Sequence, residues 1–107
     1  MPLPDILTAY FAASNAHDAD AVAATFSPDG HVHDEDHDHR GRAAIAAWAR
    51  DTFARYAMTT EALSADAAGN IQTVIARVTG TFPGSPLDLH YRFTLGATGI
   101  DTLEITA

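Results

Sequence analysis

The spacing of hydrophobic residues changes once along the chain, near residue 57, from a helical period to a strand period. In the first half, apolar side chains recur every three to four residues. This spacing predicts a helix over about residues 3–16 and a longer one over about residues 42–56. The apolar stripe of the longer helix is the clearest helical pattern in the sequence and consists of Ile45, Trp48, Ala49, Thr52, Phe53 and Tyr56.

A shorter helix is expected between these two. Asp18 is a residue type that favours the N-cap position, and the apolar face that follows it consists of Ala19, Val22, Ala23 and Phe26. The string Ser27-Pro28-Asp29-Gly30 predicts a turn after this helix, and residues 31–35 predict a short strand.

From Met58 onward, apolar and polar residues alternate, which is typical of half-buried strands. Strands are predicted over residues 58–66, 71–82, 87–95 and 100–106, and short connections between them make neighbouring strands antiparallel. Helices followed by a β-meander predict one α+β domain over residues 1–107. The three N-terminal helices are expected to pack on the concave face of a curved antiparallel sheet.

Helices that cross the concave side of a curved sheet can leave an apolar pocket between the two layers. We expect a small hydrophobic molecule to bind there. The side chains expected to line this pocket and contact the ligand are Phe26, Val32, Trp48, Phe53, Tyr56, Leu89, Tyr91 and Phe93.

The composition of the 107 residues argues against several classes of function. Asp and Glu outnumber Arg by 14 to 6, so the net charge is −8, and an acidic surface repels nucleic acid and anionic lipid. The chain has no Lys and no Cys, which removes Schiff-base chemistry, thiol nucleophiles and cysteine-based metal sites. No apolar run approaches the roughly 18 residues that span a bilayer, and no basic leader precedes Asp5. We therefore expect a cytoplasmic protein without nucleic-acid or membrane partners.

The order of the elements and three local strings resemble the nuclear transport factor two-like superfamily. The strings cover residues 10–18, 26–30 and 40–45. This superfamily has the cone-shaped, cystatin-like α+β fold of ketosteroid isomerases and SnoaL-like polyketide cyclases. The resemblance extends over essentially the whole chain, and it implies a homodimer that pairs through the sheet.

The resemblance also implies two catalytic residues. Ketosteroid isomerases place an aspartate general base at the end of the first strand and an oxyanion-hole tyrosine in the first helix, and Asp34 and Tyr10 occupy these places. Strand alternation independently points Asp34 inward, to the same side as Val32. The second oxyanion donor of that family, a protonated aspartate on a later strand, is replaced here by Leu89. Alternation points the neighbouring Asp88 to the opposite face.

The residues alone leave other interpretations open. Asp34 also fits a solvated acidic loop, and Tyr10 also fits a packed core aromatic. Residues 31–39 combine four of the six histidines with four acids. His31, His33, His37 and His39 are therefore weak candidates for metal ligands, but no regular ligand spacing occurs and we assign no metal. The neighbouring carboxylates are expected to raise the pKa values of these histidines.

The sequence thus predicts a small-molecule pocket protein of the SnoaL-like or ketosteroid isomerase-like kind. If it is an enzyme, the predicted chemistry is proton abstraction next to a carbonyl, as in an isomerase or a cyclase, without a cofactor. Asp34 would be the base and Tyr10 the polarising donor. The alternative is a non-catalytic ligand-binding or dimerisation module, in which Trp48, Phe53 and Tyr56 fill the pocket.

Overall fold

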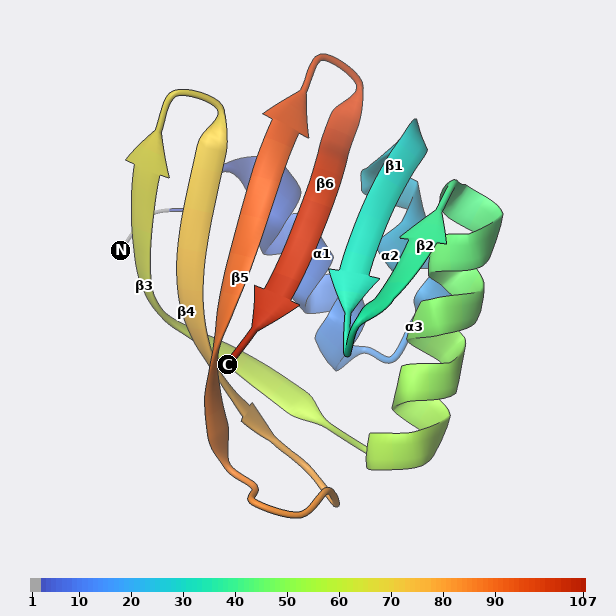
Figure 1. Cartoon of the computed structure of the whole chain (residues 1–107), viewed down its shortest axis with the longest axis vertical. Coiled ribbons are helices and arrows are strands. Elements are labelled where there is room, and N and C mark those ends of the chain that lie inside the picture. Colours follow the sequence, from blue (N-terminus) through green and yellow to red (C-terminus); the bar gives the residue numbers. More distant parts are fainter. Residues whose placement is uncertain (1–2) are drawn as a thin grey trace.

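Helices precede the main run of strands, as the change of hydrophobic period predicts (Figure 1). The computed structural model describes residues 3–107. The elements within this range are α1 (Asp5–Asn15), α2 (Ala19–Ala24), β1 (Phe26–Asp34), β2 (His37–Arg40), α3 (Arg42–Tyr56), β3 (Thr59–Ala68), β4 (Ile71–Thr79), β5 (Leu87–Gly96) and β6 (Gly99–Thr106). The predicted N-cap of α2 is confirmed, because the Asp18 carboxylate accepts a hydrogen bond from the Ala21 backbone N–H at 3.0 Å.

Two local predictions are wrong. Phe26 belongs to β1 rather than to a helix, and the segment Ser27–Gly30 is an irregular part of the same strand rather than a turn. The pairing of β1 with β6 shifts register between Phe26 and His31, and such a bulge accommodates Pro28, which has no N–H to donate. In addition, residues 37–40 form β2, although their His and Asp side chains carry little strand propensity.

The strands form one curved six-stranded sheet in the order β2-β1-β6-β5-β4-β3. Neighbouring strands are antiparallel, as predicted, except that β1 runs parallel to β6. The helices lie together on one side of the sheet, with α3 next to the β1–β2 end (Figure 1). The expected α+β fold class is therefore confirmed.

The core lies between the helices and the inner face of the sheet. Strand alternation fills this space, because Val74, Ala76 and Val78 of β4 and Tyr91 and Phe93 of β5 are all buried. Aromatic rings join the two layers: the Tyr10 ring lies 5.3 Å from the Phe93 ring and the Phe11 ring 5.6 Å from the Tyr91 ring, both measured between centroids. These contacts fix α1 against β5 and determine which of its side chains face inward.

The outer face of the sheet carries polar side chains. His31 and His33 of β1 both contact the same oxygen of Asp38, at 2.6 and 2.9 Å. This carboxylate raises the pKa of His33, and the two histidines lower the pKa of Asp38 to about 2. Pairing of two copies through this face stays a prediction. Within residues 3–107, no helix is long and apolar enough to cross a membrane.

The hairpin that joins β1 to β2 is strained at its two turn residues. Glu35 and Asp36 have φ angles of 52° and 62°, the pattern of a type I′ turn, which favours Asn and Gly. Replacing Asp36 with Gly is expected to raise the free energy of unfolding by about 0.5–1 kcal/mol, because Gly has no Cβ to clash at positive φ. Chemical denaturation measures this change. The control Asp36→Ala keeps the Cβ, and an equal gain in stability for that variant would contradict the explanation.

Candidate active site

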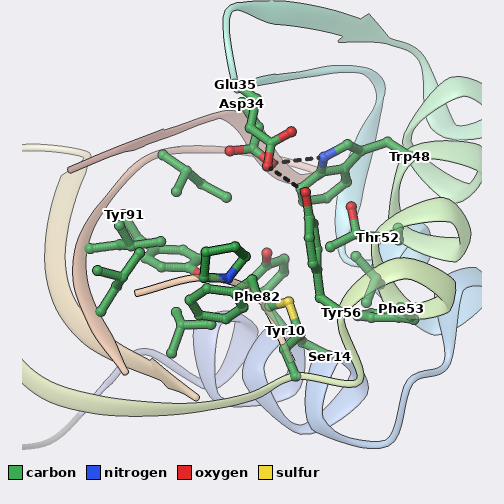
Figure 2. A pocket seen from close by; sticks show the side chains of 18 residues that line it. Tyr10, Ser14, Asp34, Glu35, Trp48, Thr52, Phe53, Tyr56, Phe82 and Tyr91 are labelled. Atoms are coloured by element: carbon green, nitrogen blue, oxygen red, sulfur yellow. Dashed lines mark hydrogen bonds between the residues drawn. The ribbon is translucent and has the colours of Figure 1, made fainter. Parts of the chain in front are cut away.

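A cavity of about 310 Å³ lies between the helices and the inner face of the sheet (Figure 2). Its lining contains two carboxylates, Asp34 and Glu35, and the hydroxyls of Ser14 and Thr52. The rest is aromatic or aliphatic and consists of Tyr10, Trp48, Phe53, Tyr56, Phe82, Tyr91, Val22, Ala49, Met58, Val78, Pro83, Leu87, Leu89 and Ile105. An apolar cavity with a few convergent polar groups is the usual form of a small-molecule site.

Asp34 is the last residue of β1, and its half-buried side chain lines the cavity. The Trp48 indole Nε1 donates a hydrogen bond to Asp34 Oδ2 at 3.1 Å (Figure 2). Burial raises the pKa of Asp34, the Trp48 hydrogen bond opposes that rise, and the negative charge of Glu35 adds to it. A hydrogen bond from the Glu35 backbone also lowers the pKa, but the net shift is upward, so the carboxylate is a stronger base than an exposed aspartate. Trp48 contacts only Oδ2 of its two oxygens.

Tyr10 extends from α1 to the same cavity. Its side chain is buried, and burial holds the pKa of its hydroxyl well above the ordinary value, with the charge of Asp34 raising it further. The hydroxyl therefore keeps its proton at neutral pH and can donate a hydrogen bond to a ligand oxygen. The two predicted catalytic residues thus line one cavity from opposite layers of the fold.

The eight predicted ligand-contacting residues separate into two groups. Trp48, Phe53, Tyr56, Leu89 and Tyr91 line the cavity. The residues that the structure does not bring to the cavity are Phe26, Val32 and Phe93, all with 0% exposure.

A physical reason is visible for the two phenylalanines among them. The Tyr10 ring packs over Phe26 and Phe93, with ring centroids 6.2 and 5.3 Å apart. Strand and helix periodicity predicts that a side chain faces inward, but it does not predict which inward side chains are covered by others.

Eleven of the 18 lining residues were not predicted from the sequence, among them Glu35 and Phe82. Glu35 is a turn residue, and alternation gives no direction for a turn. Its carboxylate accepts a hydrogen bond from the Tyr56 hydroxyl at 3.5 Å. Phe82, in the connection between β4 and β5, packs edge-on against Tyr56 with 5.9 Å between centroids. The sequence did contain a signal for Phe82: it is an aromatic residue beside a Pro-Gly-Ser-Pro turn, and a large apolar ring in a loop tends to be buried against other side chains.

The structure places Leu89, and not the neighbouring Asp88, at the cavity. Leu89 lines the cavity, whereas Asp88 is exposed on the other face and forms an ion pair with Arg77 at 2.9 Å. The predicted orientation of Asp88 is therefore confirmed, and this carboxyl group cannot serve the cavity.

The four candidate metal-binding histidines do not come together. His31 and His33 lie on the outer face with Asp38. His37 and His39 line a groove beside α3, where the His39 ring lies 6.0 Å from the Trp48 ring. Among residues 3–107, no group of three or more His, Asp or Glu side chains is arranged to hold a metal ion.

Replacing Trp48 with Phe is expected to raise the pKa of Asp34 further, because the indole hydrogen bond stabilises the charged carboxylate. Carbon-13 NMR of the Asp34 carboxyl group during a pH titration measures this shift. Phe53→Leu is the matched control, since Phe53 lines the same cavity without a hydrogen bond to Asp34. A pKa that stays unchanged or falls in Trp48→Phe would contradict the role given to the indole.

Comparison with known proteins supports this description of the fold. The model of the SnoaL-like domain family matches residues 7–105. A search of curated protein sequences found no match. A proposed polyketide cyclase from Sinorhizobium meliloti has 40% sequence identity, and the match covers 97% of this chain and 95% of that chain, with a TM-score of 0.93.

Two further solved structures share the fold at lower identity. A protein from Catenulispora acidiphila with a ketosteroid isomerase-like fold, crystallised in complex with trimethylamine, has 23% identity. The match covers 99% of this chain and 87% of that chain, with a TM-score of 0.87. The epoxide hydrolase/cyclase-like enzyme SalBIII, which acts in pyran ring formation in salinomycin, has 22% identity. Here the match covers 95% of this chain and 87% of that chain, with a TM-score of 0.82.

Proposed function

The chain belongs to the SnoaL-like domain family, and from this premise we propose that it is a cofactor-independent enzyme of the isomerase or cyclase type. Its substrate would be a small hydrophobic carbonyl compound, and its reaction would begin with removal of a proton from the carbon next to the carbonyl. The observation that carries the proposal is that a half-buried, hydrogen-bonded carboxylate and a buried, protonated hydroxyl line the same apolar cavity.

The proposed first step uses two residues. The Asp34 carboxylate takes the proton, and the electrons of the broken C–H bond move to the carbonyl oxygen to give an enolate. The Tyr10 hydroxyl donates a hydrogen bond to this oxygen and stabilises the charge that develops on it. Protonated Asp34 then returns its proton to another carbon in an isomerisation. In a cyclisation, the enolate carbon instead attacks the carbon of a second carbonyl group of the same molecule. The π electrons of that carbonyl move to its oxygen, which takes the proton from Asp34 and becomes a hydroxyl.

The proposal is tested by incubating the protein in D₂O with a panel of small hydrophobic ketones and following the protons next to the carbonyl by NMR. Catalysed loss of those proton signals, faster than in buffer alone, is the expected result. No acceleration for any ketone that binds in the cavity would contradict the proposal, because binding without exchange means that the carboxylate does not reach the carbon.

A non-catalytic ligand-binding module of the same fold is the second candidate, and Leu89 is the observation that favours it. At this position of the cavity an aliphatic side chain stands where ketosteroid isomerases have a second oxyanion donor. Such a protein would bind the same ketones and leave their protons in place. The exchange experiment therefore separates the two candidates.

A further inference from the structure

The cavity lining has a one-sided charge. Its residues include the carboxylates of Asp34 and Glu35 and no arginine or histidine, and the chain has no lysine. Low-dielectric walls concentrate the field of charges in a cleft, so a ligand in this cavity experiences a negative potential.

The two carboxylates differ in how they are compensated. Glu35 lies 3.7 Å from the guanidinium of Arg55, which also contacts Asp51 at 3.1 Å from outside the cavity. Asp34 accepts its side-chain hydrogen bond from the neutral Trp48 indole, and among residues 3–107 it has no salt-bridge partner within 4.0 Å. Asp34 also lines the groove beside α3 that contains His39, and the charge of His39 lowers the pKa of Asp34, but His39 does not line the cavity. On the cavity side the half-buried Asp34 carboxylate has no cationic partner, so a positively charged ligand group can compensate its charge there.

The rest of the lining also suits a cation. Six aromatic rings face the cavity, those of Tyr10, Trp48, Phe53, Tyr56, Phe82 and Tyr91 (Figure 2). The face of an aromatic ring attracts positive charge, and the attraction is stronger where water is excluded. The Tyr56 ring already interacts with a cation, because the Arg55 guanidinium carbon lies 4.8 Å from its centroid.

We propose that the ligand of this cavity is cationic: a carbonyl compound that also carries a protonated amine or a quaternary ammonium group. This inference rests on the proposed function for the carbonyl half of the ligand. The aromatic rings contact the ammonium group, which the negative charges of Asp34 and Glu35 attract. The Asp34 carboxylate is then left to take the proton and the Tyr10 hydroxyl to bind the carbonyl oxygen. The same field disfavours carboxylate and phosphate ligands, which would meet Asp34 and Glu35 without a cation between them.

The test compares two probes of the same shape and different charge. Choline carries a quaternary ammonium group, and 3,3-dimethyl-1-butanol is its neutral carbon analogue. Titration of each into the full chain, followed by the indole N–H signal of Trp48 in NMR, is expected to give a Kd for choline at least about tenfold lower. Tenfold corresponds to about 1.4 kcal/mol. Asp34→Asn is expected to bring the two Kd values close together, whereas Glu61→Gln, on the exposed side of β3, leaves their ratio unchanged.

Equal or tighter binding of the neutral probe would overturn the cationic ligand, and so would choline binding that leaves the Trp48 signal unmoved. Neither result bears on the proposed catalytic function, which the exchange experiment with uncharged ketones tests separately. If ketone protons exchange but choline does not bind preferentially, the enzyme proposal stands and the ligand class is wrong. If choline binds preferentially and no ketone exchanges, the cavity is a cation-binding site without the proposed catalysis.

Discussion

Asp34→Asn is expected to lower the rate of proton abstraction from a bound carbonyl compound by about 10²- to 10⁴-fold, the usual contribution of a general base. Asparagine keeps the size of the side chain and can still accept the Trp48 hydrogen bond, but it cannot take a proton. The kcat for deuterium exchange on the best ketone measures the loss. Asp36→Asn is the matched control, because Asp36 lies two residues away on the exposed side of the same hairpin. A rate within threefold of the wild type for Asp34→Asn would remove Asp34 from the mechanism.

The same substitution is expected to stabilise the fold at neutral pH. The folded-state pKa of Asp34 lies above its unfolded value of about 3.9. The folded protein therefore holds this proton more tightly, and stability falls as pH rises from about 4 through the folded pKa. Asparagine has no such titration. Chemical denaturation should show Asp34→Asn above the wild type at pH 7, with the difference shrinking toward pH 4. A variant that is less stable at pH 7 would contradict the burial given to the carboxylate.

Tyr10→Phe is expected to lower the same rate by about 10²- to 10³-fold, the loss found when one oxyanion donor is removed. Phenylalanine keeps the ring contacts with Phe93 and Phe26, so the fold should persist and the effect should fall on kcat rather than on ligand affinity. The matched control is Tyr56→Phe, whose hydroxyl lies near Glu35 and Arg55 at the edge of the cavity. Equal losses in both variants would mean that Tyr10 has no special role.

Much of the fold could be predicted from the sequence where hydrophobic period and local signals agree. The bounds of α3 match the prediction because its apolar stripe starts after Gly41 and the hydrophobic period changes soon after Tyr56. The strands β3 to β6 match within a few residues because Gly, Pro and Asn mark their ends. By contrast, β2 was not predicted. It pairs with β1 through backbone hydrogen bonds, and its His and Asp side chains give no alternating apolar pattern from which a strand could be predicted.

Those residues of the candidate site could be predicted whose place in a helix or strand determines which way the side chain points. Asp34 follows Val32 by two residues on a strand, and Tyr10 lies on the inner stripe of a helix, so both face inward. Whether an inward side chain reaches a cavity depends on what packs over it, and Tyr10 covers Phe26 and Phe93. The contribution of Glu35 depends on a strained turn, and the volume of the cavity depends on the curvature of the sheet. A periodic sequence pattern predicts neither the turn conformation nor the curvature.

The pH dependence of ketone exchange tests the central claim most directly, namely that the Asp34 carboxylate removes a proton from a ligand in this cavity. The rate is expected to rise with pH through one titration and then to stay constant. The midpoint should lie above the value of about 3.9 of an exposed aspartate, because burial raises the pKa of Asp34. In Asp34→Asn, this titration should disappear together with most of the rate. A wild-type profile without such a titration, or the same profile in both proteins, would contradict the role of Asp34 as the base.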